Sequence, residues 1–472
     1  MTREPMSRVD AAWLRMDRPE NTADIVVLLR LAGRLTPPRL RTLLEQRLLP
    51  HERFRARVAD AGALGGPAWE PDPRFSIARH LSARPLREAH PEALEAAVSE
   101  AATQPLPAGR PPWRALLLEG AEESALVVKL HHCMADGVAL VSVLLGLSDE
   151  HAGRVEAPAP DVPGGDPLRR GARALLRDPL AAAAALWKMA TLPTATGALA
   201  PPALSGRRTV AWSRSWPLED VRAAARAGGG TVNDALLAAL SGALSRALRA
   251  GPVPPGPLPD DVRALVPVNL RAAPAAGVAG AGNQFGLVFL DLPVEPLAPD
   301  ERLEIVRGRT AALKRSPDAW VALGVLGALG FAPPALERLG TAFFSRKASL
   351  VVTNVPGPQR RLHLAGRRVD ELLFWVPHPA ALGLGVSVFS YAGKVTMGVR
   401  ADAAFPIDPR ALAGALDEEL AAFAPRPPAR RARPPAAAAA PEQDGRQAAF
   451  AGAPAGRGVR VIEAGPATSP AS

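Results

Sequence analysis

The chain has 472 residues, of which 48% are hydrophobic and 22% are charged, and its formal net charge is +10. These proportions are typical of a globular protein with a sizeable buried core, and they exclude a wholly disordered chain. The single cysteine, Cys133, excludes an internal disulfide framework and any zinc or iron–sulfur centre built on several cysteines. Charged side chains run through Met1–Glu20, so we expect no secretory signal and a protein of the reducing cytoplasm.

The positive charge is spread thinly along the chain. Beyond Pro425 there are seven arginines and three acidic residues, a net +4, which leaves +6 for the rest of the chain. We find no basic stripe with interleaved aromatic side chains that could stack on bases, and we therefore expect no nucleic-acid partner. An anionic membrane surface or a nucleotide cosubstrate suits this modest excess better.

Strand-like and helix-like segments alternate in both halves, which predicts an α/β fold. The predicted strands, which are short apolar runs, are Ile25–Leu31, Ala115–Leu118, Ala125–Leu130, Val262–Val268, Gly286–Leu292, Ala348–Val352, Gly383–Phe389 and Lys394–Val399. The predicted helices, in which apolar residues recur every three or four positions, are Pro38–Arg47, Pro91–Ala102, Val138–Leu147, Asn233–Leu248 and Asp300–Leu313.

Segments rich in Pro, Gly and Ala divide the chain. They predict an N-terminal domain at 1–155, a linker with a basic helix at 156–208, a C-terminal domain at 209–424, and a disordered Arg/Pro/Ala-rich tail at 425–472. One long charge-free stretch, Ala319–Leu336, is interrupted by three glycines and by Pro333–Pro334. We expect it to be a buried or interfacial helix rather than a membrane span, which needs roughly 20 apolar residues.

Common catalytic signatures are missing, since the sequence holds no G-x-S-x-G elbow, no H-E-x-x-H pair and no phosphate loop. One stretch has side chains that could catalyse a reaction, and it lies between a predicted strand and a predicted helix. It is His131-His132-Cys133-Met134-Ala135-Asp136-Gly137. Two of only eight histidines stand next to each other in it. This stretch is therefore the candidate active site.

Successive strand side chains point to opposite faces, so we expect His131 and His132 to face apart, one toward the core and one toward a cleft. That arrangement does not favour a shared metal ion, and we expect no metal site. The imidazole in the cleft would be neutral near pH 7 and could act as a general base toward a hydroxyl. Asp136 could cap backbone N–H groups or pair with a distant arginine, and Gly137 permits a tight turn. The alternative is a pair of core histidines with Asp136 as a helix cap.

H-H-x-x-x-D-G is the active-site motif of the CoA-dependent acyltransferase superfamily, and the surrounding sequence resembles its bacterial wax ester synthase/diacylglycerol acyltransferase branch. The resemblance extends from about residue 7 to residue 422. The histidine motif alone also occurs in condensation domains, whereas the ordered set of motifs is more specific for this family. These motifs are Ser7–Leu14, Phe54-Arg55, Trp69, His80, Arg110–Trp113, Leu118–Gly120, Thr231–Asp234, Val266–Arg271, Gly282-Asn283, Thr353–Pro358 and Ser390–Gly393.

The resemblance implies two chloramphenicol-acetyltransferase-like α/β domains that form a tunnel at their interface. It implies an enzyme that moves a fatty acyl group from acyl-CoA to the hydroxyl of a diacylglycerol or long-chain alcohol, giving triacylglycerol or wax ester. Acyl-CoA would be a cosubstrate, and no cofactor is expected. The lipid substrates imply peripheral contact with the inner face of the plasma membrane or with lipid droplets, for which the basic helix and the tail are candidates.

The resemblance also assigns roles to single residues. His132 would be the general base, and the predicted catalytic set is His132, His131 and Asp136. Gly137 and Arg271 would support the motif, with Arg271 as the candidate partner of the Asp136 carboxylate. The candidates for substrate contact are Pro112, Trp113, Asn233 and Asp234, although helix capping explains the last two equally well.

Two departures from the family pattern bear on the substrate pocket more than on the reaction. Cys133 stands where the family commonly has alanine, and Asn21–Val27 replaces a strand that usually contains Met-His. Two other functions stay open. A condensation-type acyltransferase would take its acyl group from a carrier protein in secondary metabolism, but the chain shows no carrier domain. A non-enzymatic lipid-binding protein would not need the intact histidine motif.

Overall fold

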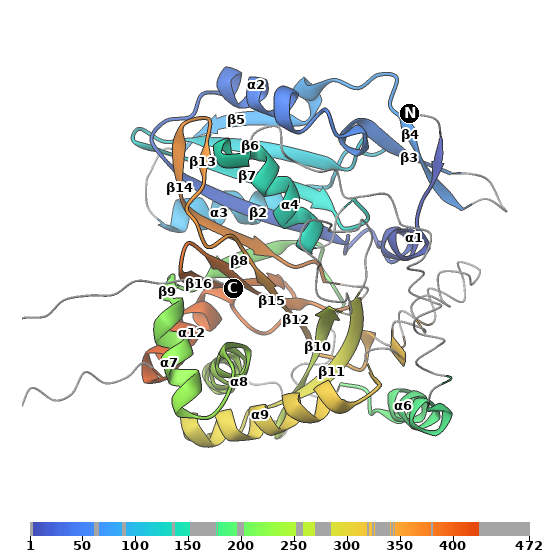
Figure 1. The fold of residues 1–472 in the computed structure, drawn as a ribbon, viewed down its shortest axis with the longest axis vertical. Coiled ribbons are helices and arrows are strands. Elements are labelled where there is room, and N and C mark those ends of the chain that lie inside the picture. The colour runs from blue at the N-terminus through green and yellow to red at the C-terminus, as the bar shows by residue number, and fades with distance from the viewer. Residues whose placement is uncertain are drawn as a thin grey trace, which may run out of the picture. The chain divides into compact units, whose positions relative to one another are not determined.

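The protein is described by a computed structural model that covers residues 3–60, 66–86, 91–134, 137–151, 176, 178–195, 203–251, 258–269, 285–318, 321–322, 325, 340, 343, 345–378 and 381–423. Residues 1–425 form one unit, which contains two large sheets and the helices that cover them (Figure 1). The predicted tail lies outside the described residues.

The first sheet has six strands in the order β13-β14-β2-β7-β6-β5. Their bounds are β2 Asp24–Ala32, β5 Leu81–Pro85, β6 Trp113–Glu119, β7 Glu123–His131, β13 His363–Leu364 and β14 Arg367–Trp375. All neighbours are antiparallel except β5 and β6, which are parallel. Leucines of α2 (Pro37–Arg47) and α4 (Gly137–Leu147) cover one face, and α3 (Pro91–Thr103) covers part of the other.

The second sheet has the order β11-β10-β12-β15-β16-β8, with the short β9 paired to β16. The strand bounds are β8 Arg208–Trp212, β9 Trp216–Pro217, β10 Asp261–Asn269, β11 Phe285–Pro293, β12 Leu350–Pro356, β15 Leu384–Tyr391 and β16 Lys394–Asp402. Helix α8 is buried against this sheet, and α7, α9 and α12 pack around it. The bounds of these helices are α7 Leu218–Ala227, α8 Val232–Ala250, α9 Pro299–Arg315 and α12 Pro409–Phe423. Figure 1 shows these helices together on one side of the sheet.

The two halves of the chain share a sheet. Strand β14 belongs to the second half of the sequence but pairs with β2 of the first half, from Val369 opposite Leu31 to Trp375 opposite Val26. Figure 1 shows this orange hairpin beside the blue and teal strands of the first sheet. The predicted domain boundaries stay predictions; residues 363–375, which they assign to the C-terminal domain, complete the sheet of the first half.

The remaining elements are small. A third sheet has the order β1-β4-β3, and the bounds of these and the other elements are β1 Glu4–Pro5, α1 Arg8–Arg15, η1 Glu52–Arg55, β3 Ala56–Asp60, β4 Pro67–Pro71, η2 Ile77–Arg79, η3 Asp149–His151 and α6 Pro179–Thr191. Within the described ranges, no helix is both long and apolar enough to span a bilayer. The predicted helices at 38–47, 91–102, 138–147, 233–248 and 300–313 correspond to α2, α3, α4, α8 and α9. Most of the stretch 319–336 lies outside the described residues.

Candidate active site

The histidine motif begins where strand β7 ends, and backbone hydrogen bonds hold it from both sides. The N–H of His131 donates to the carbonyl of Pro112 at 3.0 Å, and the N–H of His132 donates to the carbonyl of Ala23 at 2.8 Å. Because these partners precede β6 and β2, the neighbouring strands of the sheet set the position of both histidines. Pro112, a predicted substrate contact, therefore holds the main chain of the motif.

The imidazole of His131 is buried and bound at both of its nitrogens. Nε2 lies 3.0 Å from each carboxylate oxygen of Asp17, and Nδ1 accepts the N–H of Cys133 at 3.1 Å. Burial lowers the pKa of His131, whereas the charges of Cys133 and Asp17 raise it, and the net shift is upward. Nδ1 can accept the Cys133 N–H only while it carries no hydrogen, whereas the raised pKa favours the protonated ring, and in both forms Nε2–H can donate to Asp17.

The imidazole of His132 stacks on the indole of Trp13, with ring centroids 4.0 Å apart and an angle of 21° between the planes. Only 8% of the residue is exposed. Burial, together with the nearby charge of His131, lowers the pKa of His132 to about 3. The ring is therefore neutral near pH 7 and has a lone pair that can accept a proton.

The expectation that one imidazole faces a cleft stays a prediction; in this structure both histidines are buried. The physical reason is helix α1, which places Trp13 against the His132 ring. The expectation that the two rings face apart also stays a prediction; the His131 ring meets the Asp17 carboxylate, and the His132 ring meets the Trp13 indole.

Asp17 is a site residue that the sequence reasoning missed. Its carboxylate binds the His131 ring and also accepts the N–H of Ala23 at 2.8 Å, and Ala23 in turn accepts the N–H of His132. One side chain thus connects both histidines of the motif. The only signal for it was its nearness to the Ser7–Leu14 motif, which also contains Trp13.

The structure leaves part of the predicted site undescribed. Asp136 and Arg271 lie outside the described residues, so their pairing stays a prediction. Gly137 is the first residue of α4. Trp113 is fully buried, and its indole N–H donates to the carbonyl of Phe54 at 2.9 Å. That position makes Trp113 a core residue here, and its contact with substrate stays a prediction.

Asn233 and Asp234 lie at the start of α8 and make different contacts. Asp234 completes a capping box, in which its carboxylate accepts the N–H of Thr231 at 2.8 Å, and it also accepts the hydroxyl of Thr310 at 2.6 Å. Asn233 accepts a hydrogen bond at 3.1 Å from the side chain of Asn354, which belongs to the Thr353–Pro358 motif. Helix capping thus accounts for Asp234, whereas Asn233 joins two sequence motifs of the second half.

A small apolar cavity lies near the helix that follows the motif. Its volume is about 10 Å³, and its walls come from α4 and β2 and from strands β12, β14 and β15 of the second half. The lining residues are Val27, Leu140, Val141, Leu144, Val355, Leu372, Leu373, Phe374 and Phe389. Among the residues that the structure describes, no group of three or more His, Cys, Asp or Glu could hold a metal ion.

Comparison with solved structures identifies the fold. The wax ester synthase/diacylglycerol acyltransferase from Marinobacter aquaeolei VT8 superposes with a TM-score of 0.64 at 21% identity, over 89% of this chain and 98% of that chain. The condensation domain of the monacolin K polyketide synthase superposes with a TM-score of 0.57 at 17% identity, over 90% of this chain and 97% of that chain. The fold is thus the chloramphenicol-acetyltransferase-like fold that was expected.

Comparison of sequences then identifies the family. The model of the wax ester synthase/diacylglycerol acyltransferase catalytic domain matches residues 6–236, and the model of the WS/DGAT C-terminal domain matches residues 281–423. A probable diacylglycerol O-acyltransferase of Mycobacterium tuberculosis H37Rv is 31% identical over 408 residues, which cover 80% of this chain and 86% of the relative. The chain belongs to the wax ester synthase/diacylglycerol acyltransferase family.

Proposed function

We propose that this protein transfers a fatty acyl group from acyl-CoA to the hydroxyl of a diacylglycerol or a long-chain alcohol, with His132 as the general base. The observation that carries the proposal is that the His132 imidazole is neutral near pH 7. Backbone hydrogen bonds from His131 and His132 to the neighbouring segments fix the motif, and the chain belongs to this acyltransferase family. Asp17 and His131 position that loop rather than take part in proton transfer.

The reaction balances through one proton that His132 receives and returns. The acceptor oxygen attacks the thioester carbonyl while its proton moves to the His132 ring, and a tetrahedral oxyanion forms. Collapse of this intermediate breaks the carbon–sulfur bond, and the departing thiolate takes the proton, so that the products are an ester and free CoA. A ring with a pKa of about 3 holds a proton weakly, which favours its return to the thiolate. While the tetrahedral intermediate exists, its negative oxyanion stabilises the protonated, positively charged ring of His132.

Two observations support lipid substrates. First, the side chains around the cavity beside α4 are all apolar, as the surroundings of a hydrocarbon chain need to be, although the cavity itself, of about 10 Å³, is too small to hold one. Second, α6 exposes large apolar side chains, with Leu180 83% and Trp187 72% exposed, and Leu176 just before the helix is 79% exposed. Within α6, Leu180 and Trp187 are seven positions apart and fall within about 20° of one another around the helix, so they form one stripe.

We also propose that this stripe of α6 lies on a membrane or lipid-droplet surface. The opposite face of α6 is occupied, because Ala185 and Met189 pack against Val321 and Ala322. An exposed tryptophan and leucines on a helix at the protein surface are typical of interfacial binding. The double variant Leu180→Gln/Trp187→Gln should float less with diolein-containing vesicles, and equal flotation of this variant and the unaltered protein would contradict the membrane proposal.

The catalytic proposal is tested with purified protein, palmitoyl-CoA and either hexadecanol or diolein, with products separated by thin-layer chromatography. His132→Ala should lower turnover by roughly 100-fold or more, because general-base catalysis contributes about 10²–10⁴-fold. His363→Ala is the matched control, since it removes a surface imidazole that pairs with Glu150. Unchanged turnover in a folded His132→Ala variant would refute the role of His132, and turnover only with an acyl-loaded carrier protein would favour the condensation-type alternative.

A further inference from the structure

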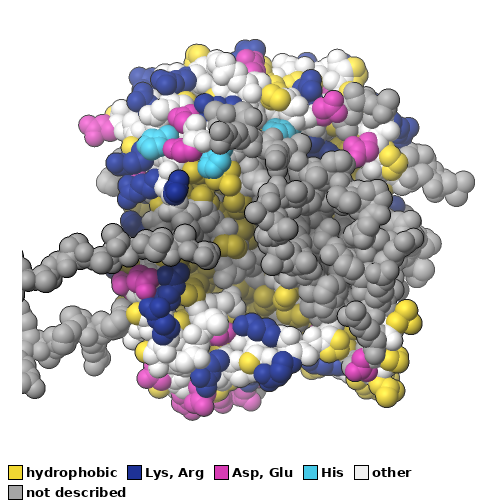
Figure 2. Space-filling view, in the orientation of Figure 1, with side chains coloured by type: hydrophobic (Ala, Val, Ile, Leu, Met, Phe, Trp, Pro, Cys, Tyr) yellow, Lys and Arg dark blue, Asp and Glu magenta, His cyan; other side chains and the backbone are white. Residues whose placement is uncertain are grey.

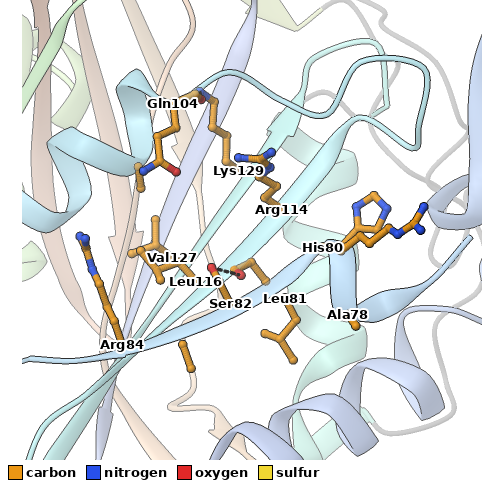
Figure 3. Close-up of a pocket in the computed structure, with 14 residues that line it drawn as sticks. Ala78, His80, Leu81, Ser82, Arg84, Gln104, Arg114, Leu116, Val127 and Lys129 are labelled. Carbon is orange, nitrogen blue, oxygen red and sulfur yellow. Dashed lines mark hydrogen bonds between the residues drawn. The ribbon is translucent and has the colours of Figure 1, made fainter.

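A groove of about 370 Å³ lies on the α3 side of the first sheet, and none of its lining residues belongs to the histidine motif. It runs over strands β5, β6 and β7 beside the end of α3 (Figure 3). Apolar residues of α3 pack on β2 and β7, which leaves the β5–β6 side of this face open. Small side chains there, Ala83 and Ala101 among them, leave the space.

The charged residues that line this groove all have the same sign. They are Arg79, Arg84, Arg114 and Lys129, and the lining includes no carboxylate. Arg84 pairs with Glu100 outside the groove at 2.6 Å. Within the described part of the chain, the guanidinium groups of Arg79 and Arg114 have neither a hydrogen-bond nor an ion-pair partner.

Two of these cations stand directly opposite each other. Arg114 of β6 and Lys129 of β7 are register partners in the antiparallel ladder, so their side chains share one face of the sheet. Like charges at such positions are roughly 5 Å apart at Cβ and destabilise the pair. Figure 3 shows the two side chains next to each other at one end of the groove. A bound anion would remove this repulsion.

Charged groups of both signs lie beneath the groove. The Lys129 ammonium lies 3.0 Å from the Asp24 carboxylate and donates to the carbonyl of Ala102 at 2.9 Å. However, the buried guanidinium groups of Arg400 and Arg208 also act on Lys129. Burial lowers the pKa of Lys129 to about 8 despite Asp24, and both arginines push it in the same direction. Carboxylates act on these buried groups, Asp24 on Lys129 and also Asp402 and Asp17 on Arg208, so the site depends on Arg79 and Arg114 for its positive charge.

We infer that this groove binds the phosphate group of an organic ligand, with Arg79 and Arg114 as its main donors. A guanidinium presents paired N–H donors whose geometry matches phosphate oxygens. The Ser82 hydroxyl, which donates a long hydrogen bond of 3.5 Å to the carbonyl of Ala115, can turn to offer a further donor. The volume exceeds what a bare phosphate fills and lies in the range of small-molecule sites. The inference stands without the proposed acyl transfer, because it uses none of the residues around His132.

Two sources could supply such a phosphate, a nucleotide or an anionic phospholipid headgroup, and one experiment separates them. The full chain is titrated calorimetrically with adenosine 3′,5′-bisphosphate and with adenosine, and it is sedimented with phosphatidylglycerol vesicles and with phosphatidylcholine vesicles. We expect binding of the bisphosphate but not of adenosine, or a preference for phosphatidylglycerol. Either result supports the phosphate site and identifies its source.

The double variant Arg79→Gln/Arg114→Gln should weaken this binding at least 10-fold, since losing about 1.4 kcal/mol of charge-assisted bonding is a factor of ten. The matched control Arg222→Gln/Arg226→Gln removes the same charge from α7, where both arginines pair with Glu219. It should bind as the unaltered chain does, so the loss cannot be a general effect of charge.

Arg114→Gln alone should also keep or raise the unfolding temperature without ligand, because it relieves the repulsion from Lys129; a purely structural arginine would give the opposite result. Should the double variant fold poorly, the exposed Arg79→Gln serves alone. The inference is overturned if no phosphate-bearing probe binds, if adenosine binds as well as the bisphosphate, or if the groove variants bind as tightly as the control.

Discussion

Acidification should destabilise this protein in part through one side chain, His132. In the folded chain its pKa is lowered to about 3, because the ring is buried beside His131 and under Trp13. In the unfolded chain the pKa returns to about 6.5. Between these values the unfolded state binds more protons than the folded state, so the free energy of unfolding falls as the pH falls below 6.5. The contribution is fully present above pH 6.5.

The size of the effect follows from the difference between the two pKa values. Each pH unit between them is worth about 1.4 kcal/mol for one group, so lowering the pH from 7.5 to 5.5 should cost about 1.4 kcal/mol through His132 alone. The full difference would reach roughly 5 kcal/mol near pH 3. The variant His132→Gln replaces the ring with a polar side chain that does not titrate and therefore lacks this dependence.

Urea unfolding at pH 7.5, 6.5 and 5.5, followed by circular dichroism, measures the effect in both proteins. Other groups with shifted pKa values, such as the buried His378, are present in both and largely cancel in the difference. We expect the unaltered chain to lose about 1.4 kcal/mol more than His132→Gln between pH 7.5 and 5.5. Equal losses would mean that the His132 ring is not held neutral by burial, and the proposed base would lose its physical foundation.

Two further substitutions test contacts around the site. Asp17→Ala removes the acceptor of the His131 ring and of the Ala23 N–H, and it should cost about 1.5–3 kcal/mol of stability and lower kcat. Asp17→Asn keeps one acceptor oxygen, so it should retain more of the stability and more of kcat than Asp17→Ala does. Identical behaviour of the two variants would contradict the positioning role of Asp17. Asp234→Ala should cost about 1–2 kcal/mol in urea unfolding through the lost cap and leave kcat unchanged. A fall in kcat at normal stability would instead favour contact between Asp234 and substrate.

The sequence by itself determined the features that depend on neighbouring residues. Hydrophobic periodicity located five helices, and the motif spacing identified the family and placed His131 and His132 at the end of a strand. Thr231 and Asp234 indicated the start of α8, because the two residues of a capping box are only three positions apart in the sequence. Such signals are visible along the chain, since the interacting groups are only a few residues apart.

Only the tertiary structure decided which distant residues complete the site. Asp17 meets His131 across 114 positions, and Trp13 stacks on the His132 ring, so that both imidazoles are buried. The pairing of β14 with β2 joins the two halves. No local pattern encodes these contacts, because each depends on how the sheets and helix α1 pack once the chain has folded. For the same reason, the like charges of Arg114 and Lys129 became opposite neighbours only when β6 and β7 were paired.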